Sequence, residues 1–340
     1  MIPRIHRALV CAVLLALVAT GCRSSGEGTE ARRSTPVPEK VVHPLTGIET
    51  EPGQAWESRP ALALKLGNAP PERPQAGLDK ADLVYEEIVE GGTTRFMAVF
   101  STNDAGRVGP IRSARKVDPT LLAPLNALFG YSGGAPSTIR VLQAASGFTD
   151  VGINRASGAY HRDSNRRSPY NLYTSTSELW AGRNGGSPKQ HFTFLKASDD
   201  PGTGSQEAAT NVRLSFAGNG SEIHYAYDMT EGTYTRNASG SPHTAEGGAP
   251  LTYRNIVVPS VEISAGYSID KAGFRTFDVK TVGSGSVVVF RGGKAFRGTW
   301  ERATDADPWR FTDESGRVIP LAPGNSIIEL LPQGRPVTVG

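Results

Sequence analysis

Cysteine is nearly absent from this chain of 340 residues, because its two cysteines, Cys11 and Cys22, both lie within the first 22 residues. The rest of the chain has no thiol for a disulfide, a cysteine-ligated zinc site or a cysteine nucleophile. An excess of one charge is lacking as well, since 36 basic side chains face 33 acidic ones. This balance does not favour nucleic acid as a partner.

Motifs for catalysis and metal binding are also missing. The glycine-rich run Gly130–Gly134 lacks the Gly-Lys-Ser/Thr ending of a phosphate-binding P-loop. The six histidines lack the spacing of metal ligands. The Gly-x-Ser-x-Gly motif of a serine nucleophile does not occur. A nucleophilic Ser113 or Ser132 would need a base from far along the chain, for which His161 is the candidate. We therefore expect no metal and no cofactor, assign no catalytic residue, and favour binding over catalysis.

The start of the chain has the features of an export signal. The apolar run Ala8–Thr20 follows Arg4 and Arg7 and is too short for a comfortable membrane span. Small residues then lead to Cys22, an arrangement that resembles the bacterial lipobox. We predict a lipoprotein signal peptide over residues 1–21 and a diacylglycerol and palmitate anchor on Cys22, on the extracytoplasmic face of the cell membrane. The alternative is an ordinary secretory signal in which Cys22 is incidental.

The remaining sequence divides by composition. Residues 22–42 carry almost no apolar side chains, which predicts a flexible tether. Residues 43–196 mix short apolar runs with helix signals, which predicts an N-terminal α/β domain. Residues 197–210 have the composition of a linker or loop, and residues 211–335 show the period-two pattern of a smaller, mainly β C-terminal domain. The expected fold class is α+β.

Individual elements follow from the same patterns. In the first domain we expect strands over 61–66 and 95–100 and helices over 120–129, 138–145 and 175–181, although Pro124 would kink or break the first helix. In the second we expect strands near 212–216, 223–227, 256–261, 287–290 and 327–331, with turns at 283–286 and at Gly292-Gly293.

Basic side chains concentrate in two windows of the N-terminal domain. The first, Arg107–Asp118, lies between a predicted strand and a predicted helix, which is where open α/β sheets place ligand sites. The second covers residues 155–171. Guanidinium groups bind phosphate or carboxylate through paired hydrogen bonds. We therefore predict an anion site formed by the following residues: Arg112, Arg115, Arg162, Arg166 and, on the preceding strand, Arg95.

Structural interpretations compete with this one. The arginines could instead pair with the upstream carboxylates Glu86, Glu87 and Glu90, which would otherwise form a solvated face or suit a glycosidase. In the second domain, Tyr225 and Trp300 are of types common at interfaces and equally common inside sheets.

Several motifs, taken in order, resemble one bacterial family. They include Glu90–Phe100, Val108–Arg115 and Asn171–Thr174 in the first domain, and Pro242-His243, Gly298-Thr-Trp300 and Pro323-Gly324 in the second. This series resembles the YerB-like lipoproteins, whose N- and C-terminal domains have no known function, over nearly all of residues 43–332. The resemblance implies a lipid anchor and a two-domain division, and it implies no reaction. Arg112 and Arg115 match the family motif.

Three functions remain open at this point. The first is a lipid-anchored extracytoplasmic protein whose arginines bind an anionic wall polymer or lipid phosphate. The second is an envelope phosphotransferase or hydrolase acting on phosphorylated glycans or lipids, with Asp118 or Asp163 as base or metal ligand. The third is a scaffold that docks an envelope protein through Tyr225, Tyr227 or Trp300 of the β-rich domain.

Overall fold

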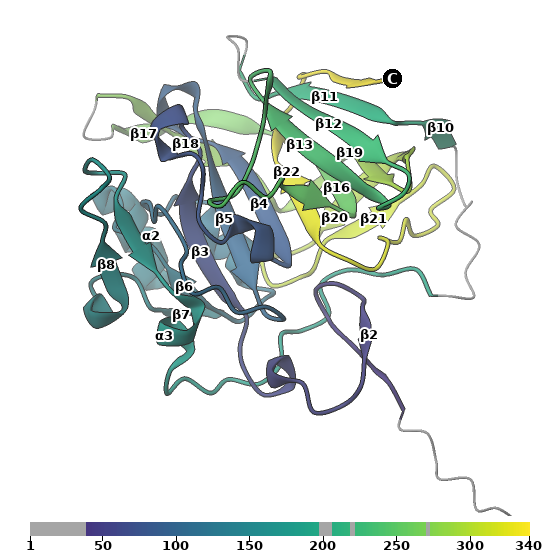
Figure 1. Ribbon diagram of the computed structural model, residues 1–340. Coiled ribbons are helices and arrows are strands. Elements are labelled where there is room, and N and C mark those ends of the chain that lie inside the picture. The colour runs from purple at the N-terminus through teal and green to yellow at the C-terminus, as the bar shows by residue number, and fades with distance from the viewer. Residues whose placement is uncertain (1–38, 197–205, 218–221, 270–272) are drawn as a thin grey trace, which may run out of the picture. The chain divides into compact units, whose positions relative to one another are not determined.

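The computed structural model describes residues 39–196, 206–217, 222–269 and 273–340 (Figure 1). The predicted signal peptide, the lipidation site Cys22, most of the predicted tether and residues 197–205 of the predicted linker lie outside the described residues. From Glu39 to Gly340 the chain forms one compact unit. No helix in the described ranges has the length and apolarity needed to cross a membrane.

One large mixed sheet takes strands from both ends of the sequence. Its centre is the parallel pair β4 (Leu83–Ile88) and β22 (Ser326–Glu329). Across the sheet the order is β10 (Gln206–Ala208), β20 (Lys294–Arg302), β19 (Gly283–Arg291), β16 (Asn255–Val261), β22, β4, β5 (Thr94–Phe100), β3 (Leu62–Gly67), β6 (Ala127–Gly130) and β7 (Phe148–Asp150), with β21 (Arg310–Thr312) and β23 (Leu331–Pro332) paired to β20 and β16. The segments predicted as two domains therefore contribute to a single sheet.

A second sheet covers one face of the large sheet. Its order is β14 (Ser241–Pro242), β13 (Thr233–Ala238), β12 (Glu222–Asp228), β11 (Asn211–Ser215) and β24 (Val337–Val339), with β15 (Thr252–Tyr253) beside β13. Leu62 and Leu64 of β3 share a hydrophobic cluster with Val212 of this second sheet, whereas Ala63 belongs to a separate cluster. The division follows from the period of a strand, whose successive side chains point to opposite faces.

The helices and small sheets are short. The helices are α1 (Asp118–Leu122), α2 (Pro136–Ala144) and α3 (Thr176–Trp180), and the 3-10 turns are η1 (Ala55–Glu57), η2 (Pro70–Glu72), η3 (Leu78–Lys80), η4 (Glu90–Gly92) and η5 (Ser157–Ala159). Three two-stranded sheets pair β1 (Val41–Val42) with β2 (Glu49–Thr50), β8 (Tyr160–Arg162) with β9 (Leu172–Thr174), and β17 (Ile263–Ile269) with β18 (Arg275–Val279).

The α+β class is confirmed, but two local predictions were wrong. The helix expected over 120–129 ends at Leu122, and β6 begins at Ala127, because Pro124 cannot continue the helical hydrogen bonds. Residues 283–286, expected to form a turn, begin strand β19. Gly292 and Gly293 do form the hairpin turn, with φ of 57° and 71°, a conformation that favours glycine.

A buried ion network joins the two sheets. It consists of Glu86 on β4, Glu329 on β22, Tyr225 on β12, Arg236 on β13, and His243, and each residue is buried. Arg236 Nη2 donates to Glu86 Oε2 over 2.6 Å, Arg236 Nε donates to the Tyr225 hydroxyl over 3.2 Å, and Tyr225 donates to Glu329. Because the partners come from four strands, both sheets must be in place before the network can close.

The network is balanced in charge. Burial, together with the neighbouring Glu86 carboxylate, raises the pKa of Glu329, which favours its neutral form. Arg236 and Glu86 then form one compensated ion pair in the core. His243 Nδ1 accepts from Arg236, and His243 Nε2 donates to Gln75 Oε1 over 2.8 Å, which requires a neutral imidazole.

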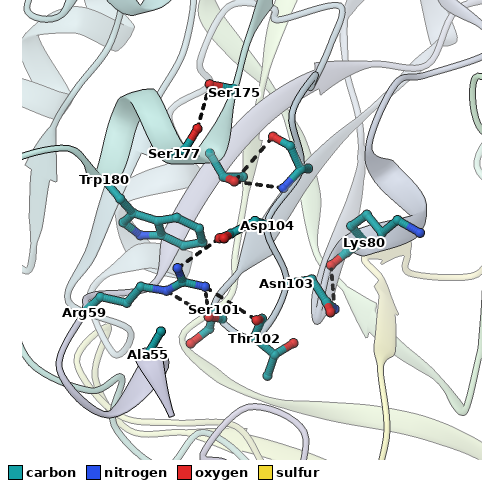
Figure 2. Close-up of polar contacts among 12 residues, drawn as sticks. Ala55, Arg59, Lys80, Ser101, Thr102, Asn103, Asp104, Ser175, Ser177 and Trp180 are labelled. Carbon is teal, nitrogen blue, oxygen red and sulfur yellow. Dashed lines mark hydrogen bonds and ion pairs between the residues drawn. The ribbon is translucent and has the colours of Figure 1, made fainter. Parts of the chain in front are cut away.

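A second set of contacts holds the loop that follows β5 (Figure 2). The Arg59 guanidinium lies 3.6 Å from the centre of the Trp180 ring and pairs with Asp104 at 2.9 Å. Arg59 Nη2 also donates to the Ser101 carbonyl over 2.8 Å. The loop leading away from β5 is thereby fixed to α3.

Replacing Arg236 with methionine should destabilise the protein strongly, because the Glu86 carboxylate would stay buried without its cation. Breaking a buried ion pair in this way costs about 3–5 kcal/mol. The double variant Arg236→Met with Glu86→Gln should recover part of that loss, since no unpaired charge remains. Urea unfolding measures both, and a loss well under about 1 kcal/mol for Arg236→Met would contradict the assigned role.

Acid should weaken the same network through His243. Burial, with further contributions from Arg236 and Arg73, lowers the pKa of His243 to about 2. Below the ordinary histidine pKa of about 6.5 the unfolded chain therefore binds a proton that the folded chain refuses, and stability falls as pH falls. The free energy of unfolding relative to a His243→Gln variant should decrease by up to about 1.4 kcal/mol per pH unit below pH ~6.5. Equal pH slopes for the two proteins would contradict this assignment.

Candidate functional site

The predicted arginine turn, residues 107–118, meets the glycine-rich run 130–134 at one edge of the large sheet. Ala114 N donates to the Gly133 carbonyl over 2.8 Å, and Ser132 N donates to the Arg112 carbonyl over 2.9 Å. β3 and β6 run parallel, so this meeting point lies beyond their carboxyl ends, the usual ligand position in such sheets. Two stretches that are separate in the sequence therefore form one structure.

A buried ionic triad holds the arginine turn in place. Lys65 of β3 contacts Glu87 of β4, and its ammonium lies 2.7 Å from Asp118 Oδ1. Asp118 Oδ2 accepts from the Arg115 backbone amide over 2.6 Å. Asp118 is fully buried, so it supports the turn and cannot contact a ligand as the base or metal ligand that the second hypothesis required.

A cleft of about 420 Å³ opens between the turn and helix α2. Arg95 and Arg115 contribute its cationic side chains, and Glu90 its carboxylate. The wall is completed by Ser113, by Ser132 with the following residues 133–136, by Thr138, and by Ile269 from the β17–β18 hairpin. We call this cavity the Arg95 cleft.

Arg95 has no acidic partner among the described residues. Within the described ranges its one hydrogen bond runs from Nη1 to the Ser113 carbonyl over 2.8 Å. Burial, with further contributions from the nearby Arg115 and Arg112, lowers the pKa of Arg95 to about 10 despite the opposing effect of Glu72 and Glu90. Arg95 is still charged at neutral pH, so the cleft contains a half-buried cation that forms no ion pair with any described residue.

Arg115 is largely neutralised by Glu90. Its Nε donates to Glu90 Oε2 over 2.9 Å, and its Nη2 contacts the same oxygen. The remaining Nη1 donates to the Ala114 carbonyl over 2.9 Å. The structural alternative, in which an arginine pairs with an upstream carboxylate, therefore describes Arg115, and the net positive charge of the cleft comes from Arg95.

Neutral donors complete the lining of the Arg95 cleft. No hydrogen bond involves the side-chain hydroxyls of Ser113 or Ser132 within the described ranges, so both can donate to a ligand. Helix α2 begins at the cleft without a side-chain cap at Ala135, and its first backbone bond joins Ile139 N to the Ala135 carbonyl. Amide groups in the first turn of a helix attract anions.

The other predicted arginines lie outside the cleft. Arg112 pairs with Glu72 at 2.6 Å, and Arg162 Nη1 donates to Asn171 over 2.8 Å. Arg166 Nη1 donates to the Tyr173 hydroxyl over 2.6 Å, and Nη2 donates to the Pro71 carbonyl. The structure therefore brings together Arg95 and Arg115 of the predicted set, while these three have partners elsewhere in the chain.

Other candidate residues have structural partners. His161 pairs with Glu178 at 2.6 Å, and Asp163 pairs with Arg107 at 2.5 Å. Tyr225 and Trp300 are buried, so neither can supply the docking face that the third hypothesis placed on them. Among the described residues no group of histidine, cysteine and acidic side chains is arranged to hold a metal ion.

Sequence reasoning missed two parts of the site. The isoleucine that completes the wall, Ile269, is about 175 residues from Arg95 in sequence, and no local pattern indicates the contact. The uncapped start of α2 follows from Ala135-Pro136, because alanine cannot accept from the helix amides and proline favours the first helical turn.

The Arg95 cleft is suited to binding rather than to bond making. It offers one uncompensated guanidinium, hydroxyls and helix amides, all of which donate to oxyanions. Its one carboxylate, Glu90, is engaged by Arg115 and is not available as a base. The arrangement fits a phosphate or a carboxylate.

Comparison with known proteins identifies relatives over nearly the whole compact unit. Two family models match, "Protein of unknown function (DUF3048) N-terminal domain" over residues 45–189 and its C-terminal counterpart over residues 212–328. "Putative lipoprotein YerB" of Bacillus subtilis is 31% identical over 299 residues, covering 86% of this chain and 87% of that protein. The crystal structure of YerB from Bacillus subtilis superposes with a TM-score of 0.74 and 27% identity, covering 88% of this chain and all of that one.

Proposed function

This chain belongs to the DUF3048 family of YerB-like lipoproteins, and we propose that it binds an anionic component of the cell envelope in the Arg95 cleft. The observation that carries the proposal is Arg95 itself. A half-buried guanidinium without a counter-ion costs stability, and proteins keep such groups mainly where a ligand completes them.

The chemistry of the lining specifies the kind of anion. The donors that line the cleft all suit a phosphate group: the Arg95 guanidinium, the hydroxyls of Ser113 and Ser132, and backbone amides at the start of α2. Glu90 neutralises Arg115, so the cleft has about one net positive charge rather than two. This favours a singly or doubly charged oxyanion over a dense polyanion.

The proposal includes a position at the membrane. A lipoprotein character is supported by the YerB relative, and Cys22 is the residue at which we place the acyl anchor after removal of residues 1–21. The compact unit starts at Glu39, so a short segment would hold this unit near the outer surface of the cytoplasmic membrane. Its ligand would then come from the membrane surface or from the adjacent wall.

Inorganic phosphate should stabilise the protein against heat, because it binds the folded state alone. At a phosphate concentration about tenfold above Kd, the gain is about 1.4 kcal/mol, which corresponds to a few degrees in Tm. The measurement is Tm against phosphate at constant ionic strength, with chloride as the reference salt. In Arg95→Met the phosphate effect should vanish, while Tm without phosphate should equal or exceed that of the original protein because an uncompensated cation has been removed.

Arg162→Met is the matched control, because Arg162 is an exposed arginine outside the cleft. It should keep the full response to phosphate. The proposal fails if phosphate moves Tm no more than chloride does, or if Arg95→Met responds as strongly as Arg162→Met.

A further inference from the structure

The β17–β18 hairpin exposes an unusual amount of apolar surface. Of the eight large hydrophobic side chains that are exposed in the described part of the chain, three lie on or beside this hairpin. They are Tyr267, Ile269 and Phe274, with 97%, 61% and 53% of their surface exposed. Soluble proteins seldom expose apolar groups in such clusters unless the surface binds something.

Polar contacts tie the hairpin and the residue segment that follows it to the arginine turn and to helix α1. Lys116 Nζ lies 2.9 Å from Asp278 Oδ1, and the hydroxyls of Thr120 and Thr281 are 2.7 Å apart. Phe277 lies beside Arg115 and Glu90 around a small internal cavity. The position of the hairpin relative to the Arg95 cleft is therefore set by specific contacts.

Ile269 connects the apolar surface to the anion site. It lines the Arg95 cleft and is also one of the three exposed apolar side chains of the hairpin. A ligand whose anionic group lies at Arg95 would therefore meet apolar surface as it leaves the cleft. A free phosphate, or a glycan phosphate with polar neighbours, would leave this surface uncovered.

We propose that the ligand is a lipid phosphate, with its headgroup at Arg95 and its hydrocarbon chain against Tyr267, Ile269 and Phe274. This rests on the proposed function and adds the class of ligand to it. Charge complementarity accounts for the headgroup, and Ile269, which lines the cleft and is also an exposed apolar side chain of the hairpin, accounts for the chain. The site combines side chains from the two segments matched by the N- and C-terminal family models, which gives a reason for the hairpin to contact the arginine turn.

The test compares two soluble probes that share a headgroup, glycerol 3-phosphate and dioctanoyl phosphatidic acid below its micelle concentration. Calorimetric titration uses the chain from residue 23 onward, which contains the entire compact unit Glu39–Gly340. The lipid should bind at least about tenfold more tightly, the effect of burying about two methylene groups. The double variant Tyr267→Ser with Phe274→Ser changes two exposed side chains that do not line the Arg95 cleft, so it should bring the lipid to the affinity of glycerol phosphate and leave glycerol phosphate unchanged.

Two further variants separate the possible outcomes. Arg95→Met should weaken both probes, and Met229→Ser, which removes an 84% exposed side chain elsewhere, should affect neither. Equal affinity of the two probes, or tighter lipid binding that survives the hairpin variant, would overturn the lipid assignment while the anion site stands. Failure of both probes to bind the unmodified chain would contradict the proposed function itself.

Discussion

The structure depends on one buried cation. Arg236 comes from the second sheet, and its compensating carboxylate, Glu86, comes from the large sheet, where Glu329 lies opposite it on the neighbouring strand. None of these side chains can be hydrated in the folded protein, so any arrangement that separates them leaves a charge buried without a partner. This constraint fixes the packing of the two sheets and the register of β22 against β4, and hydrophobic burial alone would not specify either.

Strand β4 links that network to the Arg95 cleft. Because successive side chains of a strand face opposite sides, Glu86 points to the buried ion network while Glu87 points to Lys65 and Asp118 beneath the arginine turn. The next turn, η4, supplies Glu90 to Arg115. Three acidic residues within five positions thus pair with three separate cations, and Arg95 on the adjacent strand has no acidic partner in the part of the chain that the structure describes. These three cations are therefore paired with carboxylates, and the unpaired positive charge of this region, among the described residues, belongs to the Arg95 cleft.

The sequence could predict what depends on local patterns. The strand that bears Arg95, the clustered arginines and the start of a helix after the glycine-rich run all follow from spacing and composition. It could not predict which charges pair, since Glu86 bonds to an arginine 150 residues away rather than to the nearby arginine cluster. The sequence also could not show that Arg95 lines the cleft while Arg112, Arg162 and Arg166 do not. Arginines look alike in a sequence, and only the structure shows which partner each one binds. The hairpin wall at Ile269 is a long-range contact of the same kind.

The most direct test of the anion site is a crystal of the protein grown with tungstate, a heavy analogue of phosphate, and measured for anomalous scattering. The account predicts a tungstate peak within hydrogen-bonding distance of the Arg95 guanidinium, with the Ser113 or Ser132 hydroxyl or the first turn of α2 as further donors. A crystal that binds tungstate at other arginines and leaves Arg95 without an anion would contradict it.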